Sequence, residues 1–273
     1  MTDSIMNGQP TSSWLKIDRA EKHYNALHNE LRTFAEVQPY RSITDHNADF
    51  TKHWLAVEFD QPDDFARWGL MFGDCVHNLR SALDHVVYEI GVHESGTDPP
   101  PGWKKLMFPI MATESEFQKH GEWRIKTLSD PVKAIIRRQQ PYSRSGPTDR
   151  TFMLRLHDSD IEDKHRQIRI VATSLVVGQA FVPLEGGQSV GFERFDGPLL
   201  SGTPFLTLTF PEPRPEMEMN DSSVKVGVAL EARFDDSAGS EWLDPLSVLR
   251  GFRAAVVRAL RTLAPYAGHD PAP

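Results

Sequence analysis

The chain has 273 residues, 39% of them hydrophobic, which is enough to bury one large core or a core with a small satellite domain. This composition excludes a disordered or fibrous protein. The single cysteine, Cys75, cannot form a disulfide within the chain, which argues against a secreted disulfide-rich scaffold and favours a reducing, cytoplasmic location.

Charge and hydropathy limit the expected partners. No segment approaches the roughly 18 apolar residues of a membrane span, and the polar N-terminus lacks the apolar run of a secretion signal, so we expect no membrane association. The net charge of −8 argues against a protein that binds nucleic acid over its whole surface. Residues 124–169, however, hold 11 Lys and Arg against 6 Asp and Glu, a local charge of +5. The sequence therefore allows a local basic patch on an acidic protein.

The first part of the chain predicts long helices. Apolar residues from Trp14 to Phe34 recur at helical spacing and indicate a helix of about six turns. Residues 51–59 predict a short strand or extended segment. A second helix begins at Asp63 or Asp64 and runs without proline to Ile90, and we expect Gly91 to end it.

The remaining elements change from helices to strands and back to a helix. Shorter helices are expected over 114–120, from Asp130 to before Gln140, and over 149–161. Runs rich in β-branched residues predict an antiparallel sheet or small barrel, with strands over 168–177, 189–195, 204–210 and 224–234. The dipeptide Asp244-Pro245 then begins a C-terminal amphipathic helix.

These elements predict an α+β fold, a helical bundle core with an antiparallel β-sheet insertion and a C-terminal helix. We expect three parts: residues 1–165 form a mainly helical core that carries the candidate site, residues 166–236 form the antiparallel β region, and residues 237–273 form a helix that packs back on the core.

The long helix over 64–90 has an unusual polar face. Its apolar side chains fall within an arc of about 160°, and the opposite arc of about 120° gathers short polar and titratable side chains. This polar stripe comprises Asp74, His77, Asn78, Ser81, Asp84, His85 and Tyr88, with Arg80 at its edge. Because most of these residue types are mediocre helix formers, the stripe costs local stability that a functional gain would offset. The structural alternative is that it packs against other helices through satisfied hydrogen bonds, with Arg80 and Asp84 forming an (i, i+4) pair.

Four blocks of sequence resemble a known family in their order. They are the run Gly73-Asp-Cys-Val-His-Asn-Leu-Arg-Ser-Ala-Leu-Asp-His85, then Phe108-Pro-Ile110, Gln140-Pro-Tyr142 and Asp163-Lys-His-Arg166. Together they resemble a widespread family of uncharacterised bacterial proteins, a resemblance that implies no particular chemistry.

A second resemblance concerns mechanism. The spacing Arg80-x-x-x-x-His85 is similar to the Arg-x(4 to 6)-His motif of HEPN domains, helical bundles that often dimerise and in many members cleave RNA without a metal. The chain departs from that pattern in two respects: Ser81 replaces the Asn, His or Asp that commonly follows the arginine, and a β region follows the helices.

The HEPN resemblance implies a metal-independent RNA endonuclease of toxin or defence type. His85 would then act as general acid or base, and Arg80 would bind the scissile phosphate through its planar guanidinium. Asp84 and Asn78 would orient the histidine and the substrate, and His77 would complete the catalytic group. Because Arg80 and His85 lie about 140° apart on one helix, two facing copies would bring them together better than one. A homodimer is therefore expected for the active form.

Further residues would hold the RNA. Lys164, His165 and Arg166 would add contacts to phosphates, and Tyr88 would contact the substrate. The alternative for the block Asp163–Arg166 is a charged helix terminus whose cations offset the helix dipole.

Two other function classes stay open. The polar stripe could serve a non-catalytic binding or assembly module. It could also supply a metal-dependent hydrolase, since Asp74, His77 and His85 are suitable ligands, although their spacing matches no known zinc signature. No glycine-rich phosphate loop or Cys-x-x-Cys pair occurs, and we expect no cofactor.

Overall fold

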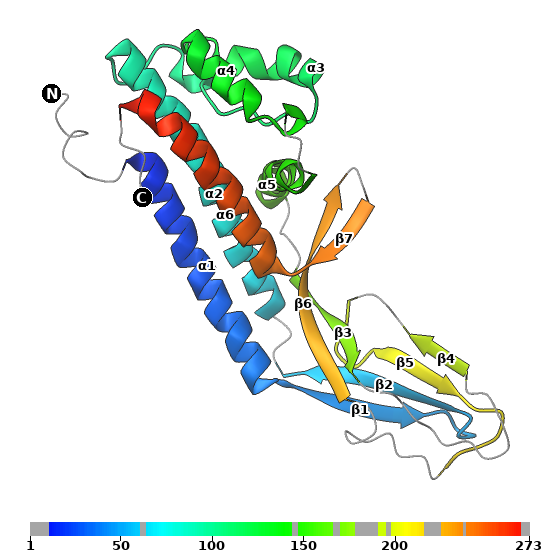
Figure 1. The fold of residues 1–273 in the computed structure, drawn as a ribbon. Coiled ribbons are helices and arrows are strands. Elements are labelled where there is room, and N and C mark those ends of the chain that lie inside the picture. The colour runs from blue at the N-terminus through cyan, green and yellow to red at the C-terminus, as the bar shows by residue number, and fades with distance from the viewer. Residues whose placement is uncertain are drawn as a thin grey trace. The chain divides into compact units, whose positions relative to one another are not determined.

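The computed structural model describes residues 11–60, 64–143, 147–165, 170–177, 191–194, 198–215, 225–236 and 239–268 (Figure 1). The chain divides into two compact units. One holds residues 1–28, 69–168 and 234–273, and the other holds residues 29–68 and 169–233. Helices and antiparallel strands together give the predicted α+β fold. Within the described ranges, no helix is both long enough and apolar enough to cross a membrane.

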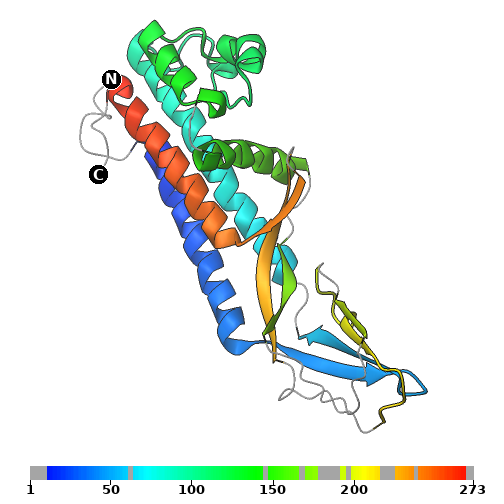
Figure 2. The same cartoon turned by 45° about the vertical axis from the view of Figure 1, so that its right-hand side comes forward.

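Three long helices lie side by side in the helical unit: α1 Ser12–Val37 as far as His28, α2 Asp64–Ser95 from Gly69 onward, and α6 Pro245–Leu263 (Figures 1 and 2). The Arg253 guanidinium pairs with Glu21 at 3.0 Å and joins α6 to α1. The apolar faces meet in a core in which the following side chains are at most 2% exposed: Leu27, Phe72, Val76, Leu79, Leu83, Val87, Ile90, Phe252, Val256, Leu260 and Leu263. The apolar arc predicted for α2 is therefore its buried face.

α5, which has the same length of 19 residues as α6, and several shorter helices complete this unit. They are η1 Trp103–Lys105, α3 Glu114–Glu116, η2 Phe117–Gly121, η3 Glu122–Ile125, α4 Asp130–Arg138, η4 Pro141–Ser143, α5 Pro147–His165 and η6 Ala264–Ala267. Phe152 of α5 packs edge-on against Phe252 of α6 with ring centroids 6.1 Å apart. The predicted start of α6 at Asp244-Pro245 is confirmed, since Asp244 accepts a hydrogen bond from the Ser247 backbone N–H at 2.8 Å and caps the helix.

The expected end of α2 at Gly91 is wrong, because the helix continues to Ser95. A Cβ atom on Gly91 would lie 2.9 Å from the Leu106 side chain and 3.2 Å from Pro100, so the glycine permits close packing of the following loop. Gly96 takes the terminating role instead: its φ is 68°, and its N–H donates to the Val92 carbonyl at 2.8 Å.

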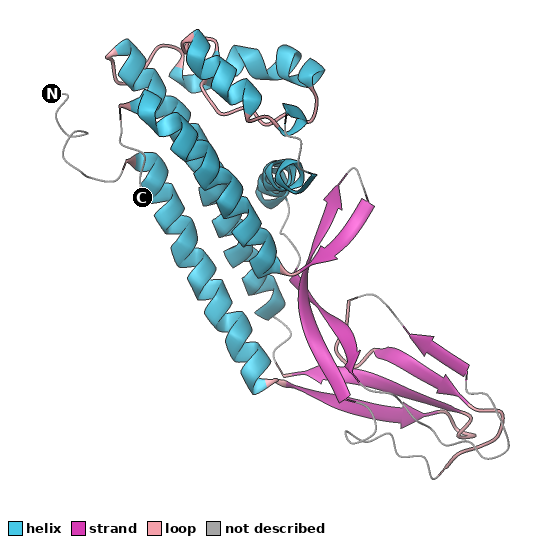
Figure 3. Ribbon diagram, viewed as in Figure 1, coloured by secondary structure: helices cyan, strands magenta, loops and turns pink. Residues whose placement is uncertain are grey.

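The second unit is built on antiparallel strands (Figure 3). A four-stranded sheet has the order β1-β2-β5-β4, formed by β1 Tyr40–His46, β2 Lys52–Phe59, β5 Pro204–Thr209 and β4 Gly191–Arg194. Tyr40 pairs with Phe59, and Lys52 pairs with Thr209, with a register shift between Leu55 and Ala56. A three-stranded sheet has the order β3-β6-β7, formed by β3 Ile170–Val177, β6 Lys225–Asp236 and β7 Gly239–Leu243. Of these strands, β3 and residues 225–233 of β6 belong to this unit, and β7 belongs to the helical unit.

The strand prediction was correct for β2 through β6 and missed β1 and β7. The sequence of β1 is mostly polar and half to fully exposed, so it lacks the apolar alternation that marks a half-buried strand. The hairpin of β1 and β2 belongs to the same compact unit as β3, β4 and β5. Residues 29–68 therefore belong to the second unit, although the sequence analysis placed them in the helical core of residues 1–165.

Candidate functional site

The polar stripe of α2 lies opposite its buried face. Leu79 and Leu83 are 2% and 0% exposed, whereas Asp74 and His77 are exposed. The stripe is graded along its length: Ser81, Asp84, His85 and Tyr88 are half-buried, and Asn78 and Arg80 are buried. Other elements of the helical unit therefore cover part of the stripe.

Arg80 is held on two sides. Its guanidinium donates to Asp84 Oδ1 at 2.8 Å and to the Phe108 carbonyl at 2.8 Å, and the side chain is only 6% exposed. Asp84 Oδ1 also accepts the Phe108 N–H at 2.9 Å. The (i, i+4) pair thus holds the Phe108-Pro109-Ile110 segment against α2.

His77 faces α5. Its Nδ1 lies 3.4 Å from Asp160 Oδ1, and Lys164 Nζ donates to Asp160 Oδ2 at 2.5 Å. The Asp160 carboxylate is only 4% exposed, so it is a buried anion shared by two cationic side chains when His77 is protonated. Lys164, predicted as a phosphate contact, therefore lies close to the stripe but is already paired.

Asp163 also reaches α2. A Cβ atom on Gly73 would lie 2.0 Å from Asp163 Oδ1, so the carboxylate occupies the space above that glycine. Burial, followed by the charges of Asp74 and Asp160, raises the pKa of Asp163. His165 is exposed at the end of α5, and Arg166 lies outside the described residues.

His85 points to a different neighbour from Arg80. Its Nδ1 lies 3.0 Å from Ser12 Oγ at the start of α1, where Glu89 accepts hydrogen bonds from Ser12 and Ser13. Burial and then the charge of Lys16 lower the pKa of His85. Arg80 contacts the Phe108 segment and His85 contacts α1, so no described hydrogen bond joins their surroundings within one chain.

The two remaining stripe candidates are engaged locally. Asn78 donates from its amide to the Asp74 carbonyl one turn earlier at 2.8 Å. Tyr88 donates its hydroxyl to Asp98 Oδ1 at 2.5 Å, and this bond is the main cause of its raised pKa. The Asn78 bond lies within α2, and the Tyr88 bond joins α2 to the loop that follows it.

Two residues that sequence analysis did not select join Arg80. His157 lies on α5, and its Nδ1 is buried with no hydrogen-bond partner among the described residues. Burial, and then the charges of Arg80 and Arg124, lower its pKa to about 4. Arg124 of η3 likewise has a buried Nε that no described residue satisfies, and burial followed by the charge of Arg80 lowers its pKa. Spacing along the chain could not reveal either residue, although a histidine between Leu156 and Asp160 on a packed helix is a weak signal.

We call this group the α2–α5 cluster. It consists of Arg80, Asp84, Arg124, His157, Asp160 and Lys164. Asp84 pairs with Arg80, and Asp160 pairs with Lys164. Arg124 has no ion pair among the described residues, although the charge of Asp84 acts on it, so the part of the cluster around Arg80, Arg124 and His157 holds two cations and one carboxylate.

The three candidate metal ligands do not converge. Asp74 lies 3.6 Å from His23, His77 faces Asp160, and His85 faces Ser12. In the part of the chain that the structure describes, no group of three or more His, Cys, Asp or Glu is placed to hold a metal ion.

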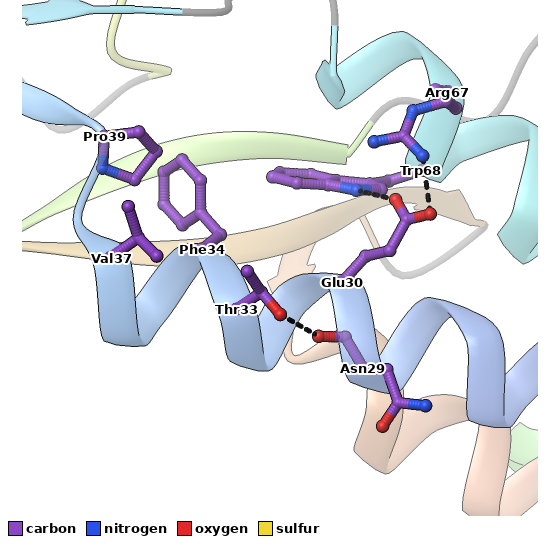
Figure 4. Close-up of a pocket in the computed structure, with 8 residues that line it drawn as sticks. All are labelled: Asn29, Glu30, Thr33, Phe34, Val37, Pro39, Arg67 and Trp68. Atoms are coloured by element: carbon purple, nitrogen blue, oxygen red, sulfur yellow. Dashed lines mark hydrogen bonds and ion pairs between the residues drawn. The ribbon is translucent and has the colours of Figure 1, made fainter.

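The strand unit has a separate pocket of about 430 Å³ between the end of α1 and the start of α2 (Figure 4). Phe34 and Trp68 pack edge-on within it, 5.2 Å between ring centroids. Glu30 accepts hydrogen bonds from Arg67 and from the Trp68 indole, the latter at 2.8 Å. The Glu30 carboxylate is therefore already paired within the protein, and the α2–α5 cluster is the stronger candidate for a binding site.

Comparison with known proteins provides no relative from which a role could be transferred. No protein-family model, curated protein or solved structure matches the chain. The side-chain arrangement is therefore the basis for the assignment below.

Proposed function

We propose that the chain is a binding module that takes a phosphate group at the α2–α5 cluster. One observation carries the proposal: Arg124 Nε and His157 Nδ1 are both buried, have no described hydrogen-bond partner, and share their surroundings with Arg80. Buried polar atoms are hydrogen-bonded in the great majority of cases, and both of these atoms lie within range of the Arg80 charge, so an anion would be a suitable acceptor there. Guanidinium groups match the oxygen geometry of phosphate.

The electrostatics support an anion as that partner. Burial, and then the charges of Arg80 and Arg124, lower the pKa of His157, so a proton on the imidazole would meet two positive charges. A bound phosphate would offset both and would favour the imidazolium. Binding is then linked to proton uptake and strengthens as the pH falls from neutrality.

The experiment is isothermal titration calorimetry of the full chain with inorganic phosphate and pyrophosphate, repeated in buffers of different ionisation enthalpy. We expect binding with proton uptake near pH 6, and a loss of affinity of about tenfold or more in Arg124→Gln or His157→Gln. The matched control is Lys22→Gln, an exposed residue of α1. Absence of binding of the folded wild type to either anion would overturn the proposal.

A catalytic form of the same site is a second candidate, favoured by the neutral imidazole. Arg80 and Arg124 would hold the scissile phosphate of RNA, and His157 would accept the 2′-hydroxyl proton, a role that the HEPN resemblance gave to His85. A base whose pKa is about 4 is weak until the phosphate raises that pKa. Cleavage of single-stranded RNA in the presence of a chelator, lost in His157→Ala and kept in His85→Ala, would support it. Loss of cleavage in His85→Ala but not in His157→Ala would instead assign the catalytic role to His85 of the Arg80-x-x-x-x-His85 motif.

A further inference from the structure

A surface groove that shares Arg124 with the α2–α5 cluster is lined by aromatic and cationic side chains. It is lined by Gly102, Trp103, Lys104, Lys105, Trp123, Arg124, Lys126 and Thr127 and has a volume of about 390 Å³. This volume falls within the range of small-molecule sites. Four of its lining side chains are cationic, two are tryptophans, and none of the described residues that line it is acidic.

The tryptophans are unusually open. Trp103 is 47% exposed and Trp123 is 43% exposed, although tryptophan is the side chain with the largest apolar area to bury. One exposed aromatic ring is ordinary, but two rings on the walls of one concave site leave apolar faces for a planar ligand.

A cation lies over each ring. Lys104 Nζ is 5.7 Å from the centroid of Trp103, and Arg124 Cζ is 5.6 Å from that of Trp123. Each of these cation–π contacts covers one face of its ring, so a planar ligand would stack on the other face. The nearest acidic neighbour in sequence, Glu122, is paired with Arg137 and does not neutralise Arg124.

The backbone fixes the two walls close together. Gly102 has φ 72°, a left-handed conformation that starts η1, and a Cβ atom there would lie 3.4 Å from the Thr127 methyl group. The turn thus brings residues 103–105 opposite residues 123–127 without a large side chain between them.

We propose that this groove binds single-stranded nucleic acid. Bases stack on Trp103 and Trp123, while Lys104, Lys105 and Lys126 contact the backbone phosphates. Stacking platforms interleaved with cations are the combination that unpaired strands require, because every base has an aromatic face and every nucleotide a phosphate. The inference rests on the proposed phosphate site through Arg124, which belongs to both the groove and the cluster, and it names the class of ligand.

The test uses fluorescein-labelled oligouridylate and oligothymidylate with the full chain, measured by fluorescence anisotropy and by quenching of tryptophan emission. We expect Trp103→Ala and Trp123→Ala each to weaken binding about 5- to 150-fold, the range found for loss of one stacked base. Trp→Phe variants should retain part of the affinity. The control is Tyr266→Ala, which removes a 37% exposed ring elsewhere in the helical unit.

Charge is tested by a triple variant in which Lys104, Lys105 and Lys126 become Gln. Its matched control carries the same change at Lys22, Lys52 and Lys119, which are exposed outside the groove. Since a single strand releases about 0.7 counterion per neutralised phosphate, the groove variant should bind more weakly and show a flatter salt dependence than the control.

The outcomes separate this inference from the proposed function. Phosphate binding without any oligonucleotide binding overturns the groove and leaves the cluster. Oligonucleotide binding that depends on the tryptophans, with no binding of inorganic phosphate or pyrophosphate, supports the groove and overturns the proposed function. Binding of the wild type to anionic phospholipid vesicles, with no binding to either oligonucleotide, would assign the groove to a membrane surface and overturn the inference.

Discussion

His157 predicts a specific dependence of stability on pH. Its pKa falls from 6.5 to about 4 on folding, chiefly through burial and then through Arg80 and Arg124. Between these two values the unfolded chain binds a proton that the folded chain does not bind. The free energy of unfolding is therefore highest above pH 6.5 and decreases as the pH falls toward 4.

The size of the effect follows from the shift. At about 1.4 kcal/mol per pKa unit, the full shift corresponds to about 3 kcal/mol. Acidification from about pH 7 to about pH 4.5 covers most of the interval between the two pKa values of His157, so the free energy of unfolding should fall by about 2 kcal/mol. For a chain of 273 residues this lowers the melting temperature by about 4 °C, and by more if the helical unit unfolds separately.

The assay compares melting temperatures of the wild type and His157→Gln across this pH range. Carboxylates titrate equally in both proteins, so their effect cancels in the difference. We expect the wild type to lose stability more steeply than the variant, and His28→Gln, which removes an exposed histidine of α1, to follow the wild type. Parallel curves for the wild type and His157→Gln would refute the reasoning.

Three further predictions concern packing and burial. Asp84→Ala should lower the free energy of unfolding by about 1–3 kcal/mol, measured by urea denaturation, because the buried Arg80 and the Phe108 N–H each lose an acceptor; Asp84→Asn should cost less. Gly251→Ala places a Cβ atom 2.3 Å from the Phe152 ring and should destabilise by about 1–3 kcal/mol, with the loss reduced in combination with Phe152→Leu. Burial raises the pKa of the Cys75 thiol to about 12, so it should react with a disulfide reagent only after denaturation, and rapid labelling of the folded chain would contradict its placement.

Local patterns predicted most of the fold. The apolar arc of α2 and the β-branched runs of β3 through β6 depend only on the geometry of a helix or a strand, so they can be read without knowing their neighbours. The continuation of α2 past Gly91 depends on Leu106 and Pro100, which pack against that glycine. The strand β1 depends on its partner β2, because its own sequence lacks an apolar face.

For the candidate site, the sequence by itself determined that Arg80, His85 and the other stripe residues share one side of a helix, since each residue turns the helix by about 100°. Only the tertiary structure decided that Arg80 turns toward Phe108 and His85 toward Ser12. It also brought Arg124 and His157 from distant segments to Arg80. The physical reason is that helix periodicity is set by backbone geometry within a few residues, whereas the partners of a buried charge are set by which helices pack together, and that depends on the whole core.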